Sequence, residues 1–123
     1  MPAKRPEEIC HLFQQAMAAG DLDAVLSVFD PEAVLVNPSG EVTQGRDGLR
    51  QELAPLAAMK TRVAFTNKQV IQSGDVALMP TEWRVSFPLP VSVSTMAVAR
   101  RQPDGTWRWL IGDPFTVGRH TAS

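Results

Sequence analysis

The stretch AAGDLDAVLSVFDPEAVLVNPSGEVTQGRDGLRQEL, residues 18–53, decides the fold. It opens on a joint between two helices, where Gly20 suits a left-handed helix end and Asp21 can cap the helix that follows. Before the joint, apolar residues recur every three or four positions from Ile9 to Met17, which predicts an amphipathic helix. After it, a shorter helix is expected to stop at the Asp-Pro pair. Neither helix can bury its apolar stripe alone, so we expect a sheet to cover both.

The rest of this stretch predicts short elements. Residues 34–36 are typical of a short strand that ends at an Asn-Pro turn, and residues 42–43 could form its partner. A third helix is predicted from Arg46 to about Ala58. Because Pro55 lies inside this segment, we expect a kink or an early end there.

The second half of the chain has the pattern of a β-sheet. Four predicted strands, 61–72, 76–87, 91–102 and 106–111, are separated by turn signals, of which the Pro-Asp-Gly turn at 103–105 is the sharpest. Strands as long as the first three must twist or bend strongly. We therefore predict an α+β fold, in which a cone-shaped, curved antiparallel sheet wraps around N-terminal helices.

Composition limits the class of protein. The 123 residues carry a formal net charge of −1 and no strongly basic stretch, which argues against nucleic-acid binding. No apolar run is long enough to span a membrane, so a cytoplasmic protein is expected. With Cys10 as the single cysteine and no well-placed pair of histidines, we expect no disulfide, metal or cofactor. Residues 1–123 are predicted to form one domain, with a core of about 6–115 and a loose C-terminal tail.

Three local motifs occur together and in order. They are the helix joint with its NPSG turn and GRDGL helix start in 18–53, SGDVAL at 73–78, and PDGTWRWLIGDPF at 103–115. In this combination the chain resembles the SnoaL-like branch of the nuclear-transport-factor-like superfamily. The resemblance covers about residues 6–115 and implies a cystatin-like α+β barrel. It says less about activity, because this fold hosts isomerases, cyclases, hydrolases, dehydratases and non-catalytic partners.

Ketosteroid isomerases are the best-understood relatives in this resemblance. They move a proton beside a carbonyl with a carboxylate base, while a tyrosine and a protonated aspartic acid hold the oxyanion. Matched motif to motif, the tyrosine position falls on Phe13, the base on Asn37 and the acid near Ala97. Phe cannot donate a hydrogen bond, Asn is no base near neutral pH, and Ala can serve in neither role. The resemblance therefore implies a scaffold without the isomerase machinery.

Limonene epoxide hydrolases are similar in fold and activate water with an Asp–Arg–Asp relay. Glu82 and Arg84 share one parity of a predicted strand, and Asp113 ends the last strand. Asp113 and Glu82 are therefore the candidates for a catalytic acid or base. The alternatives are solvated salt bridges and, for Asp113, a cap at the strand end. We assign no catalytic residue from the sequence.

An apolar pocket is the alternative to catalysis. Small-molecule sites generally have an apolar lining with few polar anchors. The candidate ligand-binding residues are Asn37, Phe13, Met17, Trp83, Phe87 and Trp109. Simple core packing by the aromatic residues, and a local turn role for the asparagine, remain alternatives.

Three functional hypotheses follow from these patterns. The first is a homodimer whose cone binds a small, largely apolar molecule without catalysing a reaction. The second is an isomerase-, cyclase- or hydrolase-type enzyme acting on a polyketide-, steroid- or terpenoid-like substrate. The third is a protein-interaction or dimerisation module. The outer sheet face, where Val76, Leu78, Val98 and Leu110 lie among charged residues, is the predicted homodimer interface.

Overall fold

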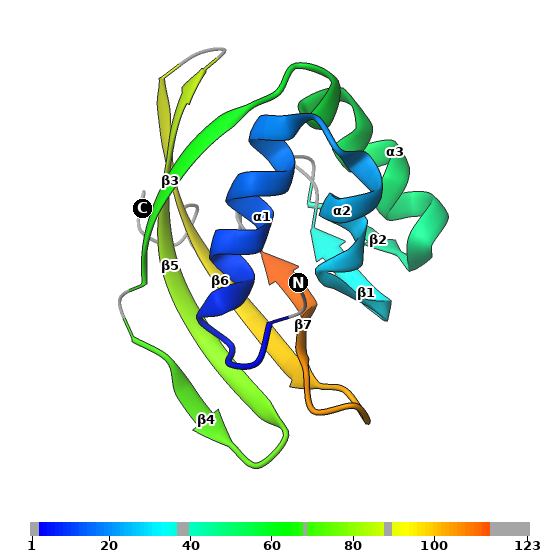
Figure 1. Ribbon diagram of the computed structural model, residues 1–123, viewed down its shortest axis with the longest axis vertical. Coiled ribbons are helices and arrows are strands. Elements are labelled where there is room, and N and C mark those ends of the chain that lie inside the picture. Colours follow the sequence, from blue (N-terminus) through cyan, green and yellow to red (C-terminus); the bar gives the residue numbers. More distant parts are fainter. Residues whose placement is uncertain (1–2, 37–39, 68, 88–89, 114–123) are drawn as a thin grey trace.

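The computed structural model of the chain describes residues 3–36, 40–67, 69–87 and 90–113. This part folds into three helices and seven strands (Figure 1). The helices are α1 (Glu8–Ala19), α2 (Leu22–Ser27) and α3 (Gly45–Ala58). The strands are β1 (Phe29–Val36), β2 (Val42–Gln44), β3 (Arg62–Asn67), β4 (Ile71–Ser73), β5 (Val76–Phe87), β6 (Val91–Arg101) and β7 (Trp107–Asp113).

One curved sheet contains all seven strands, in the order β2-β1-β7-β6-β5-β3, with β4 pairing β5 beside this path. The α+β fold class, with helices enclosed by a curved sheet, is thus confirmed. One detail differs from the antiparallel expectation, because β1 and β7 pair in parallel. The sheet is therefore mixed, and its edge strands β2 and β3 do not join each other.

The helices occupy the concave side of this sheet. Figure 1 shows α1 lying along the hollow formed by β3, β5 and β6, with α2 and α3 beside β1 and β2. Helix α1 packs against β3, and α3 packs against both α2 and β1. The helices and the inner sheet face together bury the core, whose largest fully buried side chains include Ile9, Met17, Leu49, Met79 and Val25.

The joint between α1 and α2 forms as the sequence predicts. Gly20 adopts a left-handed conformation with φ of 72°, and its N–H donates to the carbonyl of Met17 at 3.1 Å. The Asp21 side chain accepts a hydrogen bond from the backbone N–H of Ala24 at 3.1 Å. The glycine reverses the chain and the aspartate starts the next helix, so two adjacent residues fix the angle between two helices.

The boundary between α2 and β1 differs from the prediction. Helix α2 ends at Ser27, and β1 starts at Phe29 and runs through Pro31, where the sequence suggested a helix stop. The Arg46 guanidinium donates to the backbone carbonyls of Leu26 and Phe29, so a side chain from α3 satisfies the end of the short helix. The register of β1 against β7 also shifts between Phe29 and Val34, which leaves room for a residue without an N–H.

One further boundary was predicted wrongly. The single strand expected at 61–72 is two strands, because β3 pairs with the second half of β5 while β4 pairs with its first residues. Helix α3 ends at Ala58 as predicted, and of the two outcomes expected at Pro55 the early end does not occur. The expected loose tail and the Asn-Pro turn lie outside the described residues.

Candidate functional site

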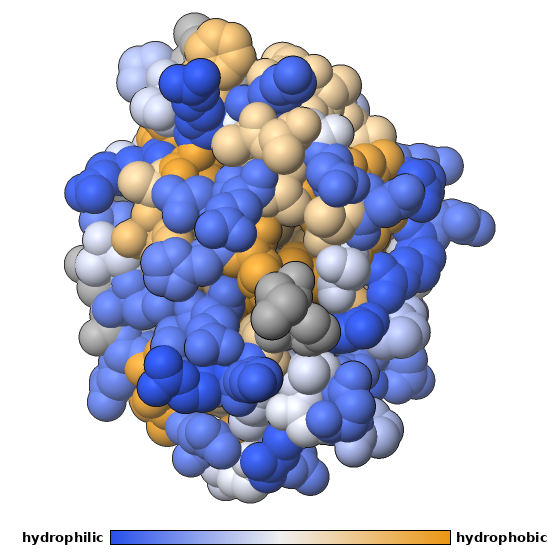
Figure 2. Space-filling view, in the orientation of Figure 1, coloured by the Kyte–Doolittle hydropathy of each residue, from blue (hydrophilic) through white to orange (hydrophobic). Residues whose placement is uncertain are grey.

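A cavity of about 450 Å³ lies between the helices and the concave face of the sheet. Helices α1 and α3 and strands β1, β3, β5, β6 and β7 all contribute side chains to it. Leu56 lines the cavity from the last turn of α3 and is 38% exposed, so the cavity approaches the surface beside this helix. In the space-filling view, apolar residues gather over the upper parts of α1 and α3, while hydrophilic residues dominate below (Figure 2).

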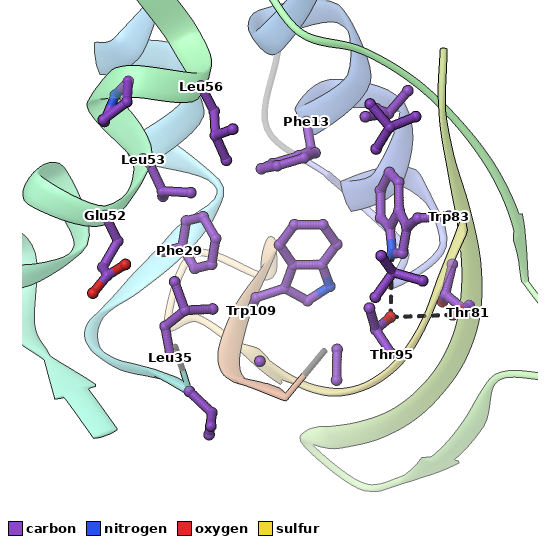
Figure 3. Close-up of a pocket in the computed structure, with 17 residues that line it drawn as sticks. Phe13, Phe29, Leu35, Glu52, Leu53, Leu56, Thr81, Trp83, Thr95 and Trp109 are labelled. Atoms are coloured by element: carbon purple, nitrogen blue, oxygen red, sulfur yellow. Dashed lines mark hydrogen bonds between the residues drawn. The ribbon is translucent and has the colours of Figure 1, made fainter. Parts of the chain in front are cut away.

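Four aromatic side chains from four different elements meet in the cavity wall. The ring centroid of Phe13 lies 5.4 Å from that of Trp83 and 5.3 Å from that of Trp109. The Phe29 ring lies 5.5 Å from Trp109, and the two tryptophans lie 6.1 Å apart. Most of these pairs are edge-to-face, an arrangement that stabilises by about 0.5–1.5 kcal/mol per pair beyond the buried area. Figure 3 shows the rings grouped around one apolar space.

Strand alternation explains which side chains face the cavity. On β5, Thr81, Trp83 and Val85 point inward, because successive residues of a strand point to opposite faces. On β7 a register shift interrupts this alternation, since Trp109 pairs with Ala99 whereas Gly112 pairs with Ala97. Trp109 and Gly112, although three residues apart, therefore both face the cavity.

One side of the cavity carries a chain of paired polar groups. The indole N–H of Trp83 donates to Thr95 Oγ1 at 3.2 Å, and the Thr95 hydroxyl donates to the carbonyl of Thr81 at 3.2 Å. The Thr81 hydroxyl donates in turn to Asn67 Oδ1 at 2.9 Å. The Cys10 thiol donates to the same oxygen at 3.6 Å, and burial raises the pKa of this thiol to about 12. These contacts hold the Trp83 ring in place.

Trp109 differs from Trp83 in its hydrogen bonding. Its indole nitrogen Nε1 is buried and meets no acceptor among the described residues. The side chain as a whole is 7% exposed. A buried donor without a partner costs about 1–3 kcal/mol relative to a paired one.

Among the described residues that line the cavity, one is charged, and it is Glu52. It lies on α3, and its Oε1 accepts a hydrogen bond from the Thr43 hydroxyl at 3.3 Å. The sequence did not indicate Glu52 as a site residue, because in the third helix only the apolar stripe forms a recognisable pattern. Its position next to Leu53, which is buried, is the signal that could have placed it beside the cavity.

The predicted ligand-binding residues are only partly brought together. Phe13, Trp83 and Trp109 line the cavity jointly. Met17 is 1% exposed and belongs to the core cluster, whereas Phe87 is 50% exposed near the end of β5, and neither is among the lining residues. Asn37, expected to anchor the ligand, lies outside the described residues.

Of the two catalytic candidates, Glu82 is not among the residues that line the cavity. Glu82 lies between two inward-pointing residues of β5, so its side chain belongs to the outer face, next to Thr66 and Ser94 on the neighbouring strands. Asp113 ends β7 opposite Met96. Ala97, at the position that the resemblance matches to a catalytic acid, does line the cavity.

No helix within the described ranges is long and apolar enough to cross a membrane. Within the same ranges, no three His, Cys, Asp or Glu side chains come together as ligands for a metal ion.

The curved sheet and the helices that it encloses form a cystatin-like α+β fold, shared with solved structures of that description. The model of the SnoaL-like domain matches residues 11–116, which is most of the chain. The protein therefore belongs to the SnoaL-like domain family. No curated protein matches the chain.

Solved structures support the fold. A ketosteroid isomerase-like protein from Erwinia carotovora is 19% identical, with a TM-score of 0.67 over 87% of this chain and 89% of that one. A protein of unknown function with a cystatin-like fold from Nostoc punctiforme is 20% identical, with a TM-score of 0.73 over 87% and 84%. At these identities the similarity shows the shared fold alone.

Proposed function

We propose that this protein is a binding module that holds a small, largely apolar molecule in the cone. The observation that supports this function is the cavity of about 450 Å³ whose wall contains four aromatic rings. Small-molecule sites typically have volumes of about 300–1,000 Å³ and a mainly apolar lining. Transfer of apolar surface from water into such a cavity contributes about 25 cal/mol per Å².

The composition of the wall favours binding over chemistry. Phe13 and Ala97 can neither donate nor accept a proton. The hydroxyl of Thr95 is committed to a backbone carbonyl, and Glu52 accepts a hydrogen bond from Thr43. The wall is thus built to exclude water and match shape, which is what retention of an apolar ligand requires.

A cavity-filling substitution tests the proposal. Tetralin, a bicyclic hydrocarbon, should raise the melting temperature of the protein, because a ligand that binds only the folded state stabilises it. Ala97→Phe places a ring inside the cavity and should abolish this rise. Met96→Phe, the adjacent residue on the opposite face of β6, is the matched control and should keep it. The proposal fails if tetralin leaves the melting temperature of the unsubstituted protein and of the control unchanged.

An enzymatic role, as an isomerase, cyclase or hydrolase, has one observation in its favour. Glu52 places a carboxylate beside an apolar cavity, where a substrate proton could be reached. If a reaction of this site is found, Glu52→Gln should lower kcat strongly with little change in melting temperature. Full activity of that variant would remove this role.

The proposed functional unit is a homodimer joined through the outer sheet face. Four strands place apolar residues in one row across this face, because Ile71 pairs with Leu78, Leu78 with Val98, and Val98 with Ile111. Three of these are exposed large apolar side chains, Ile71 at 48%, Leu78 at 37% and Ile111 at 41%. A continuous apolar row of this kind is typical of an interaction surface.

A further inference from the structure

The cavity wall contains the buried indole N–H of Trp109 in addition to the polar side chains of Thr81, Thr95 and Glu52. The Trp109 nitrogen is covered by neighbouring side chains and meets no acceptor among the described residues. The ring is fixed on β7 and contacts Phe13, Phe29 and Trp83 at centroid distances of 5.3, 5.5 and 6.1 Å. A ring packed on several sides cannot easily turn its N–H out to solvent, so the donor stays inside the cone.

Two hydroxyl groups of the cavity wall, those of Thr95 and Thr81, each already take part in hydrogen bonds within the protein. Figure 3 shows the nitrogen-bearing edge of Trp109 directed across the cavity toward Thr95. The Thr95 oxygen accepts the N–H of Trp83 at 3.2 Å and gives its own proton to a backbone carbonyl. The Thr81 hydroxyl is likewise committed to Asn67 at 2.9 Å. The two tryptophans therefore differ, since the indole N–H of Trp83 is paired by the protein and that of Trp109 is buried without an acceptor among the described residues.

Building on the proposed function, we infer that the ligand carries a hydrogen-bond-acceptor oxygen, of the ketone type, which accepts from Trp109 Nε1. The oxygen relieves the cost of an unpaired buried donor, a gain that a pure hydrocarbon cannot provide. A neighbouring ring must shift slightly to admit it, because the nitrogen is covered. Thr95 Oγ1 accepts one hydrogen bond within the protein, so its second lone pair offers a further polar contact to a ligand that also carries a hydroxyl.

The experiment compares tetralin with 1-tetralone, two probes of nearly the same shape that differ by one carbonyl oxygen. The protein contains three tryptophans, so a nitrogen-15 spectrum of the indole region resolves three N–H signals. Trp109→Phe assigns the signal of interest by its disappearance. We expect 1-tetralone to move the Trp109 N–H proton downfield and tetralin to leave it nearly unmoved. The ketone should also bind about fivefold more tightly than the hydrocarbon, the size of one net hydrogen bond.

The variant provides a second, independent measure. In Trp109→Phe the preference for the ketone should disappear while binding of tetralin persists, and Trp83→Phe should keep the preference because its N–H is already paired. If both probes bind but the ketone neither moves the Trp109 signal nor binds more tightly, the inference is wrong and the binding function stands. If neither probe binds, the proposed function fails, and this inference fails with it.

Discussion

At the residue scale, Asp30 is a buried charged residue whose hydrogen bonds stabilise the fold. Its side chain is 2% exposed, and its two carboxylate oxygens accept from the Arg100 guanidinium at 3.0 and 2.9 Å. Gln102 Nε2 and the backbone N–H of Glu32, each at 2.8 Å, complete the site. Removal of this buried carboxylate leaves several donors of the site without their charged acceptor, which is more damaging than the loss of a surface ion pair.

Asp30→Asn should therefore lower the free energy of unfolding at neutral pH by about 2–3 kcal/mol. Glu32→Gln is the matched control, because Glu32 bonds the same arginine at 2.8 Å but is 74% exposed. It should cost less than about 1 kcal/mol. Urea titration of the three proteins measures both effects, and equal losses in the two variants would contradict the structural role of Asp30.

The same carboxyl sets a pH dependence. Burial raises the pKa of Asp30, but the hydrogen bonds from Gln102, the Glu32 N–H and Arg100 outweigh it, and the net pKa is lowered from its usual value of 3.8. The contribution of Asp30 is thus fully present above the pKa of the unfolded chain and is lost as the pH falls through the lower, folded pKa. The stability difference between the protein and Asp30→Asn should shrink below about pH 4. A constant difference down to acid denaturation would show that the charge of Asp30 is not what stabilises the fold.

At the element scale, the start of α3 is fitted closely to β2. A Cβ built at Gly48 would lie 2.5 Å from the methyl Cγ2 of Thr43, while the Thr43 hydroxyl is held by Glu52 at 3.3 Å. Alanine is the better helix former by about 1 kcal/mol, so on propensity alone the substitution should stabilise α3. The close approach reverses this expectation, because overpacking costs about 1–3 kcal/mol.

Gly48→Ala should consequently lower the free energy of unfolding by about 1 kcal/mol, the difference between these two opposing effects. Thr43→Ser removes the methyl group and keeps the hydroxyl, so the same glycine substitution in that background should be neutral or stabilising. Urea titration of the double-mutant cycle checks the coupling between the two positions. A loss that is the same in both backgrounds would show that Thr43 is not the obstacle.

Elements were predictable where local chemistry determines them. The Gly20-Asp21 joint and the start and end of β5 follow directly from cap and turn residues. The register shift in β7 could not be predicted, because β7 pairs not only with β6 but also with β1, a strand far from it along the chain. Without that shift, alternation would place Trp109 and Ile111 on the same face, whereas in the structure the first faces the cavity and the second is 41% exposed.

At the scale of the whole molecule, the curved sheet around the helices could be predicted from the sequence. The residues that line its cavity could be predicted only in part. Local motifs in the expected order were enough for the fold class, and three aromatic lining residues followed from alternation and helix spacing. Met17 was expected in the cavity wall but lies in the core, because one apolar stripe of α1 faces both the cavity and the core. Phe87 was also expected in the wall but is exposed, because a strand face can continue beyond the core into solvent. Glu52 was missed because its position depends on how α3 packs across the cone.

The proposed dimer is the prediction that belongs to this scale. Leu78 lies in the middle of the apolar row, between Ile71 and Val98, so Leu78→Lys introduces a charge that an apolar interface cannot accommodate. Because Leu78 is 37% exposed in the single chain, the substitution should change the melting temperature of the monomer little. We expect equilibrium sedimentation at micromolar concentration to show a dimer for the unsubstituted protein and a monomer for this variant.

Gln51→Lys, an exposed position on α3, introduces the same charge away from the sheet and should leave the dimer intact. A monomeric unsubstituted protein at micromolar concentration would refute the dimer outright. A dimer that persists in Leu78→Lys would place the interface elsewhere. In either case binding of tetralin within the cone is measured separately, because the cavity and the apolar row lie on opposite faces of the same strands.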